Sequence, residues 1–351
     1  MHHAAIIGPG VQVFPQLGWP AASAAEPTGG LGWPSVEVAA EVSRETSSRP
    51  PAPRQHTPLA SEIERQVRLE RTLRSGEPLP KPAHTRVFAV ANQKGGVGKT
   101  TTAVNIAAAL AQSGQRVLVV DLDPQGNAST ALAVEHTEGV PGSYEAVVEG
   151  NNIREVVRES PQLPGLFVVP ASIDLAGAEI DLVSMVARES RLRRALTGYL
   201  AETGDSGQRF DYVFVDCPPS LGLLTVNALV AAAEILVPIQ CEYYALEGVG
   251  QLLRTTEMVR AHLNPDLNMS TIILTMHDAR TRLSAGVADE VRTHFPNQVL
   301  RTAIPRSVRV SEAPSHHQTV LTYDSGSPGA LSYLEAAREI AWRGSGSGGS
   351  A

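Results

Sequence analysis

The chain of 351 residues has few cysteines and few aromatic residues, and it has no long apolar run. Its only cysteines, Cys217 and Cys241, predict no disulfide framework and fit a reducing compartment. The most apolar stretch, residues 229–239, is interrupted by Glu234 and Pro238, so it falls short of the roughly 18 residues of a membrane-spanning helix. We therefore expect a cytoplasmic protein that neither enters a membrane nor carries a secretion signal.

Positive charge is also scarce, since the formal net charge is -7 and the isoelectric point is about 5.8. This balance excludes a chain that is basic throughout, although a local patch of arginines can still bind nucleic acid. Lysine is the rarest basic residue and occurs only as Lys81, Lys94 and Lys99. Two of the three thus lie close together in one short segment.

That segment, residues 88–102, reads FAVANQKGGVGKTTT, and it joins an apolar strand predicted over residues 86–92 to a helix that ends near Gly114. Glycines allow successive backbone N–H groups to surround a phosphate, and the helix N-terminus adds its positive dipole end. Lys99 is expected to reach the β- and γ-phosphates, and the Thr100 hydroxyl to ligate Mg²⁺. The predicted nucleotide-binding residues of this loop are Gly95, Gly96, Val97, Gly98, Lys99, Thr100 and Thr101.

The loop departs from the common G-x-x-x-x-G-K-[ST] pattern, because Gln93 or Lys94 stands near the position of the first glycine. With lysines at both ends it resembles the deviant Walker A ATPases, the group that includes ParA, MinD and the nitrogenase iron protein. The resemblance implies that Lys94 crosses a dimer interface to the partner's ATP. Lys94 and Lys99 are accordingly expected to be catalytic, one acting in trans and the other in cis.

A second predicted strand, residues 116–121, ends in two carboxylates, Asp121 and Asp123. Carboxylates at the carboxyl end of a strand lie where open α/β sheets place their chemistry. Strand alternation suggests that both point the same way. In the resembled family this is the switch I segment, which implies that Asp123 positions the attacking water and is a further candidate Mg²⁺ ligand. The alternative is that Asp123 only caps the following turn.

A third strand is predicted within residues 210–219, FDYVFVDCPP, where five mostly apolar residues precede Asp216. This is a Walker B pattern, so Asp216 is expected to hold Mg²⁺ through water or through the Thr100 hydroxyl. Pro218 and Pro219 end the strand because neither can donate to a ladder. The residues that follow, 220–222, fit a mobile switch II that senses the γ-phosphate.

Two further segments, QCEYYALEG (residues 240–248) and IPRSVRVSEAP (residues 304–314), closely resemble ParA chains. The resemblance places the second segment, with Pro305 and Arg306, against the adenine. Four arginines fall in loops after successive predicted strands, and we expect them to contact DNA from one face of a dimer. These are Arg280, Arg282, Arg306 and Arg309.

The expected fold is an α/β, doubly wound, mostly parallel sheet with helices on both faces, as in P-loop NTPases. Residues 1–84 read as a largely disordered extension with one short helix over 61–73, residues 85–342 as the ATPase domain, and 343–351 as a flexible Gly/Ser tail. A helix is expected through most of residues 171–200. Its four arginines, at positions 188, 191, 193 and 194, suggest a solvated face or, alternatively, a DNA contact.

Together these segments resemble chromosome-partitioning ATPases of the ParA (Soj) type over about residues 86–340. The resemblance implies Mg²⁺-dependent ATP hydrolysis, an ATP-dependent homodimer on nonspecific double-stranded DNA at the nucleoid, and stimulation by a ParB-like centromere-binding protein. A membrane-cycling regulator like MinD would need a basic amphipathic C-terminal helix, which residues 331–342 do not provide. An iron–sulfur protein like the nitrogenase iron protein would need cysteine segments that Cys217 and Cys241 do not match.

Overall fold

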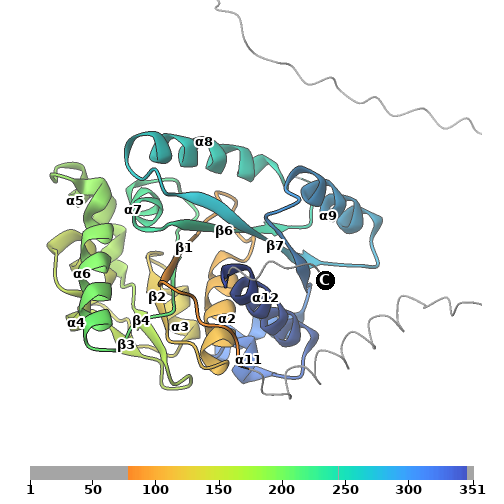
Figure 1. The fold of residues 1–351 in the computed structure, drawn as a ribbon, viewed down its shortest axis with the longest axis horizontal. Helices are drawn as coiled ribbons and strands as arrows, with labels where there is room; N and C mark the ends of the chain where they lie inside the picture. Colours follow the sequence, from red (N-terminus) through yellow and green to blue (C-terminus); the bar gives the residue numbers. More distant parts are fainter. Residues whose placement is uncertain (1–77, 244, 346–351) are drawn as a thin grey trace, which may run out of the picture. The chain divides into compact units, whose positions relative to one another are not determined.

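The computed structural model describes residues 78–243 and 245–345, so the helix expected over residues 61–73 lies outside the described part. An eight-stranded sheet in the order β3-β4-β2-β5-β1-β6-β7-β8 forms the centre of this part (Figure 1). All neighbouring strands pair in parallel except β3 and β4, which are antiparallel. The strands are β1 (Arg86–Val90), β2 (Val117–Asp121), β3 (Arg158–Glu159), β4 (Leu166–Val169), β5 (Tyr212–Asp216), β6 (Glu234–Gln240), β7 (Asn268–His277) and β8 (Val299–Pro305).

Helices cover both faces of the sheet, and a separate apolar core lies under each face. The central strands are buried on both sides, which explains why they read as continuous apolar runs rather than as alternating patterns. One core is closed by α2 (Lys99–Gln112), α3 (Asn127–Ala131), α11 (Val320–Tyr323) and α12 (Pro328–Gly344). The other lies under α4 (Ile153–Val156), α5 (Ala178–Val183), α6 (Arg191–Asp205), α7 (Leu223–Ala231), α8 (Glu247–His262) and α9 (Arg282–His294). A short helix, α10 (Val308–Glu312), follows β8.

The doubly wound fold is as predicted. Residues 171–200 are largely helical, as expected, but the helix is interrupted, because α5 ends at Val183 and Ala187 adopts a left-handed conformation with φ of 53° before α6 begins. One helix, α7, was not predicted, because its sequence is apolar all round and shows no helical period. Arg191, in the expected arginine cluster, donates to the carbonyl oxygens of Val147 at 2.5 Å and Val148 at 2.7 Å, so it joins two parts of the fold.

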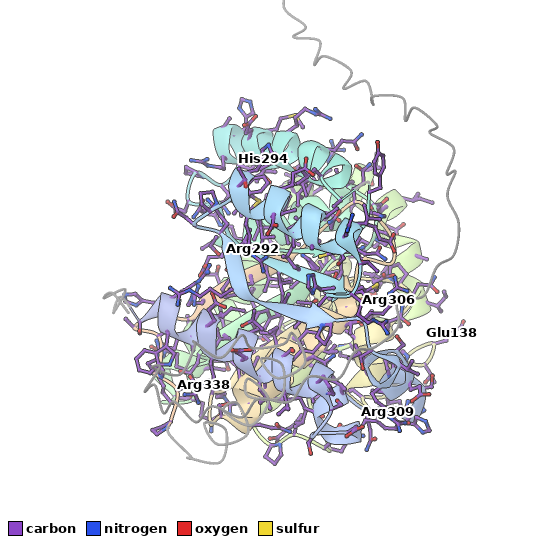
Figure 2. All side chains as sticks on the ribbon, turned by 90° about the vertical axis from the view of Figure 1, so that its right-hand side faces the viewer. Glu138, Arg292, His294, Arg306, Arg309 and Arg338 are labelled. Carbon is purple, nitrogen blue, oxygen red and sulfur yellow. The ribbon has the colours of Figure 1, made fainter. Side chains whose placement is uncertain are left out.

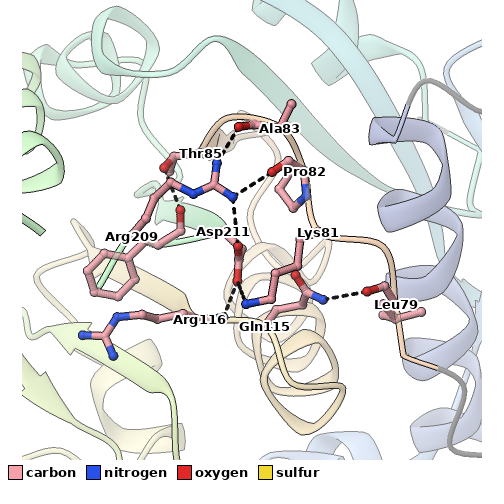
Figure 3. Close-up of polar contacts among 10 residues, drawn as sticks. Leu79, Lys81, Pro82, Ala83, Thr85, Gln115, Arg116, Arg209 and Asp211 are labelled. Carbon is pink, nitrogen blue, oxygen red and sulfur yellow. Dashed lines mark hydrogen bonds and ion pairs between the residues drawn. The ribbon is translucent and has the colours of Figure 1, made fainter. Parts of the chain in front are cut away.

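Residues 79–85, the amino-edge segment, bind the edge of the sheet at which the parallel strands begin (Figure 3). The Gln115 side chain, just before β2, donates to the Leu79 carbonyl at 3.1 Å. Lys81 pairs with the buried carboxylate of Asp211, just before β5, at 3.3 Å. The expected boundary of the ATPase domain, residue 85, is the last residue of this segment. Further hydrogen bonds join Arg209 to the carbonyls of Pro82 and Ala83, and Thr85 to the carbonyl of Phe210.

Candidate nucleotide and magnesium site

The candidate site lies at the opposite edge of the sheet, where β2, β5 and β1 end side by side. Val90 and Asp121 both pair in register with Asp216, so the three strands finish at the same level. The loops that leave them, residues 91–98, 122–126 and 217–222, therefore meet at one place. The three patterns singled out in the sequence are thus adjacent because of strand order rather than chain order.

The glycine loop after β1 has the backbone conformation that its glycines predict. Gly96 and Gly98 have φ of 73° and 88°, in the left-handed region that side chains disfavour. Gly98 precedes α2 and offers no side-chain cap, so the first amides of the helix are left for a ligand. Val97 is buried below the loop, and its carbonyl accepts a hydrogen bond of 2.8 Å from the hydroxyl of Thr275 in β7. This bond anchors the loop from beneath.

Lys99 begins α2, and only 7% of its surface is exposed. Its ammonium donates to the carbonyl of Lys94 at a long distance of 3.4 Å. Burial lowers the pKa of Lys99, and the carboxylates of Asp216 and Asp123 act in the opposite direction. An ammonium has three donors, so most of its capacity remains for an anionic ligand.

Asp216 ends β5 and is completely buried, yet neither of its carboxylate oxygens has a partner with full hydrogen-bond geometry. Burial raises the pKa of Asp216 well above its ordinary value, and the Asp121 carboxyl raises it further, while the nearby Thr100 hydroxyl and Lys99 lower it. Buried polar groups in native proteins are normally paired. An orphaned carboxylate beside a hydroxyl fits a cation or cation-bound water, the role predicted for Asp216 and Thr100.

Within the described residues no three or more His, Cys, Asp or Glu side chains converge on one point to form a metal cage. This agrees with the chemistry of Mg²⁺, which keeps several waters and takes other ligands from phosphates. The donor set of one hydroxyl and one orphaned carboxylate therefore fits Mg²⁺ better than a metal held wholly by protein ligands.

Asp121 and Asp123 have different surroundings, although both follow β2. The buried Asp121 accepts hydrogen bonds from the amide and hydroxyl of Ser129 at 2.9 and 2.7 Å, and from the Asp123 amide at 3.2 Å. Burial raises the pKa of Asp121 to about 6. One oxygen of Asp123 accepts from the Gln125 amide at 3.1 Å, as a turn residue would, and Asp123 also lines the cleft described next. Asp121 thus anchors the loop that presents Asp123.

Two cavities meet above the glycine loop. The first has a volume of about 330 Å³, and the second, of about 130 Å³, shares Gly98, Thr101 and Met276 with it. A phosphate chain and a flat base would need two joined spaces of this kind. Predicted residues that line the first are Gly95, Gly96, Gly98, Lys99, Thr100, Thr101 and Asp123, and those that line the second include Pro305 and Arg306.

Several lining residues were not predicted. Met276 lies between the two cavities with φ of 51°, an uncommon conformation for a non-glycine residue. Asn127, Pro314 and Tyr333 also line the cavities. Two of them belong to segments that the sequence marked: Pro314 lies in IPRSVRVSEAP, and Asn127 follows Asp123 in the stretch DLDPQGNAST. Nothing local marked Met276 and Tyr333.

Lys94 lies outside the lining of both cavities, and a third of its side chain is exposed. Its ammonium is 3.8 Å from one carboxylate oxygen of Glu242. The other Glu242 oxygen is 3.3 Å from Arg306 and accepts a hydrogen bond of 2.6 Å from Gln240. Glu242, for which no role was predicted, therefore joins the glycine loop to the segment after β8.

The four arginines expected to contact DNA are exposed and follow two adjacent parallel strands, β7 and β8. The Arg306 amide donates to the His277 carbonyl at 3.1 Å, which ties the two loops together. Arg306 and Arg309 are labelled on the same side of the molecule in Figure 2. Three of the four have acidic partners: Arg280 pairs with Asp278, Arg306 with Glu242, and Arg309 with Glu312 and Asp324.

Comparison with known proteins gives a consistent result. A family model described as an AAA domain matches residues 85–269. The chain is 49% identical over 259 residues to the sporulation initiation inhibitor protein Soj of Bacillus subtilis, covering 74% of this chain and 99% of Soj. It is also 49% identical over 255 residues to the chromosome partitioning protein ParA of Myxococcus xanthus, covering 73% and 87%.

A solved structure named cobyrinic acid a,c-diamide synthase from Mycobacterium smegmatis, with bound ADP and magnesium, matches with a TM-score of 0.61. The match is 41% identical in sequence and covers 72% of this chain and 92% of that chain.

Within the described residues, none of the helices has the length and apolar character needed to cross a bilayer.

Proposed function

Because the chain belongs to the ParA/Soj family of chromosome-partitioning ATPases, we propose that it uses Mg²⁺ and ATP to cycle between a monomer and a DNA-bound homodimer. A ParB-like partner on centromere DNA would stimulate hydrolysis and so release the dimer. The observation that carries the ATPase chemistry is the buried, orphaned carboxylate of Asp216 behind a cleft lined by Lys99 and Thr100.

The residues present fit Mg²⁺·ATP. Thr100 and Asp216 would hold the metal, with Asp123 as a further ligand, and bound Mg²⁺ would neutralise charge on the β- and γ-phosphates. The backbone amides from Gly95 to Thr100 would surround the phosphate chain, and the buried Lys99 would place a positive charge beside it. The smaller cavity, lined by Pro305 and Arg306, would take the adenine.

Asp123 is the residue we assign to the attacking water. The three hydrogen bonds that Asp121 accepts anchor the loop of Asp123, and Asp123 lines the cleft. One of its oxygens is used by the Gln125 amide. The other oxygen can accept a hydrogen bond from a water molecule, and such a bond would orient that water for attack.

Lys94 suits a role in trans because it does not line the cleft of its own chain. Its acidic partner, Glu242, is about half exposed, and an exposed ion pair of this kind contributes roughly 0–1 kcal/mol. Exchange of that carboxylate for the γ-phosphate of a second copy therefore costs little. Apart from its two neighbours in the chain, no atom of the described residues lies within 4 Å of a Cβ added at Gly95. Lack of space within one copy therefore does not account for this glycine, whereas close approach of a second copy would.

DNA binding would follow from dimerisation. Each phosphate neutralised contributes close to one unit to the salt dependence of binding, so one copy with a few arginines binds weakly and two copies bind usefully. The acidic partners of Arg280, Arg306 and Arg309 further weaken the positive electrostatic potential that one copy presents to DNA. Contact with phosphates would replace these partners.

The name of the Mycobacterium smegmatis structure raises an alternative, ATP-dependent amide formation. If the ammonia came from glutamine, a reactive thiol would be needed. Both cysteines of this chain are buried, and burial raises the pKa of each thiol, so neither is suited to that role. The partitioning function is therefore favoured.

The test is binding to random-sequence duplex DNA at fixed moderate salt, with no nucleotide, with ADP and with Mg²⁺·ATP. The wild type should bind DNA strongly only with Mg²⁺·ATP. Asp123→Ala should stay bound to DNA longer, because it does not hydrolyse ATP, and Lys99→Ala should not bind DNA.

Arg306→Ala tests the DNA contact itself. It should bind DNA more weakly, and its affinity should depend less steeply on salt concentration, while ATP hydrolysis is largely kept. DNA binding that is equal in all three nucleotide states would contradict the proposed cycle, and normal hydrolysis by Asp123→Ala would contradict the role of Asp123.

A further inference from the structure

A group of large apolar side chains around α5 is exposed to solvent. Ile180 is 78% exposed, Val183 59% and Val186 90%, and Ile173 just before the helix is 57% exposed. The inward side of the same helix is also apolar, since Ala178 and Leu182 are buried. We call these four exposed residues the α5 patch. A contiguous exposed apolar group on a protein surface commonly marks an interaction site.

The acidic side chains of this segment do not interrupt the patch, because each is engaged elsewhere. Asp174 accepts a hydrogen bond from the Ser172 hydroxyl at 2.9 Å, and Asp181 accepts one from the Tyr144 hydroxyl at 3.0 Å. One carboxylate oxygen of Glu179 is buried. These are the only charged residues between positions 173 and 187, and all three are less exposed than the four patch residues, so apolar side chains form most of the outward surface of the segment.

The patch belongs to the same edge of the sheet as the nucleotide cleft. β4, which precedes it, runs parallel to β2 and ends at Val169, so residues 170–187 leave the sheet at the edge where β1, β2 and β5 also end. Lys94 lies at this edge too. Two copies that bring each Lys94 to the other's phosphates must therefore place these edges face to face, and the α5 patch with them.

The segment also touches the loop that would sense the γ-phosphate. Glu179 packs so closely on Gly222 that a Cβ at residue 222 would overlap its carboxylate. The buried oxygen of Glu179 has no hydrogen-bond partner, although it lies at the N-terminal side of α7. A shift of residues 218–222 on nucleotide binding would therefore displace the Glu179 carboxylate, which links the surroundings of α5 to the nucleotide.

We propose that the α5 patch is buried against a second copy of this chain when the nucleotide-bound dimer forms. This inference rests on the proposed function and adds the apolar part of its interface. A stable interface buries roughly 800 Å² on each partner. The glycine loop and Lys94 contribute little apolar surface to such an interface, whereas the four patch residues contribute more. In a two-fold symmetric dimer both copies bury the same patch, so this apolar contribution counts twice.

The experiment uses accessibility of an introduced thiol in the full-length protein. The native cysteines are 0% and 4% exposed, so Val183→Cys would provide the readily labelled thiol. Trp342→Cys is the matched control: Trp342 is 44% exposed, and its helix binds the start of β1 through a hydrogen bond from Arg86 to the Ile340 carbonyl, at the opposite edge of the sheet. The rate of labelling by a thiol reagent is measured with no nucleotide, with ADP, and with Mg²⁺ and a non-hydrolysable ATP analogue, while sedimentation velocity reports the dimer.

We expect the analogue to slow labelling of Val183→Cys at least tenfold and to leave Trp342→Cys unchanged. Ile180→Asp should abolish the dimer while the monomer still binds nucleotide, and Trp342→Asp should dimerise normally. If the wild type dimerises but Val183→Cys is labelled equally fast in all states, the patch lies outside the interface and the proposed function stands. If the wild type forms no dimer with the analogue, the proposed function and this inference both fail.

Discussion

Replacement of Asp216 by Asn should make the nucleotide-free protein more stable while it removes the response to Mg²⁺·ATP. Both carboxylate oxygens are buried without partners, and the raised pKa of Asp216 shows that its surroundings disfavour the charged form. A neutral amide of nearly the same shape removes that cost, which is about 1–3 kcal/mol for an unsatisfied buried polar group. For a domain of this size each 1 kcal/mol shifts Tm by roughly 2–4 °C, so Tm should rise by roughly 2–12 °C.

Ligand binding should have the opposite outcome. Mg²⁺·ATP at 100 times its Kd stabilises a native protein by about 2.7 kcal/mol, and this gain requires the metal to bind. Asp216→Asn should therefore lose most of the Mg²⁺-dependent increase in Tm that the wild type shows. Scanning calorimetry at pH 8, with and without Mg²⁺ and nucleotide, measures both effects on the same samples.

Asp211→Asn is the matched control, because Asp211 is a buried aspartate at the other end of the same strand. Its carboxylate accepts from the Arg116 amide at 2.8 Å and pairs with Lys81 and Arg209 (Figure 3). Loss of a satisfied charge should lower Tm and leave the nucleotide response intact. The reasoning is refuted if Asp216→Asn lowers the Tm of the nucleotide-free protein, or if it keeps the Mg²⁺-dependent increase.

The pH dependence gives a second check on Asp216. A carboxyl whose native pKa is raised stabilises the protein below its unfolded pKa and loses that contribution as pH rises through the native value. The advantage of Asp216→Asn over the wild type should thus grow between pH 5 and pH 8. A difference in Tm that is constant across this range would contradict burial of the charge as the cause.

Three further predictions concern the residues around the cleft. Lys94→Ala should abolish nucleotide-dependent dimerisation in sedimentation velocity while nucleotide binding to the monomer changes less than threefold; a normal dimer would contradict action in trans. Glu242→Gln removes the exposed partner of Lys94 and Arg306, which is worth up to about 1 kcal/mol, so the dimer should tighten up to about fivefold; a weaker dimer would show that Glu242 supports the interface instead. Because the native pKa of Asp121 is raised to about 6, wild-type stability should fall by up to about 3 kcal/mol between pH 4 and pH 7, and Asp121→Asn should flatten that slope in urea unfolding; an unchanged slope would assign the titration to another group.

The parts of the site that could be predicted are those fixed by local sequence. Gly96 and Gly98 had to be glycine for their backbone conformation, and Asp216 follows an apolar strand whose end fixes its place in the sheet. The doubly wound sheet was predictable for the same reason, since strands buried on both faces leave a continuous apolar signal. Each of these features depends on a few neighbouring residues.

The features that escaped prediction depend on contacts between distant segments. Glu242 joins Lys94 and Arg306, which are separated from it by 148 and 64 positions, and no local pattern marks that meeting. Asp121 and Asp123 look equivalent in the sequence. Only the fold shows that the Asp121 carboxylate accepts hydrogen bonds from the amide and hydroxyl of Ser129. The break before α6 rests on the single left-handed residue Ala187, an alanine that any helix would accept.

The amino-edge segment has a practical consequence for making shortened or fused forms of the protein. A chain that starts at residue 78 keeps the bonds of Leu79, Lys81 and Thr85, whereas one that starts at residue 86 strips the buried Asp211 of its lysine partner and should express as a less stable protein. The new terminus would lie at the edge away from the nucleotide cleft. A fluorescent domain or a surface tether attached there would leave the nucleotide edge open, which makes residue 78 the better starting point for single-molecule work.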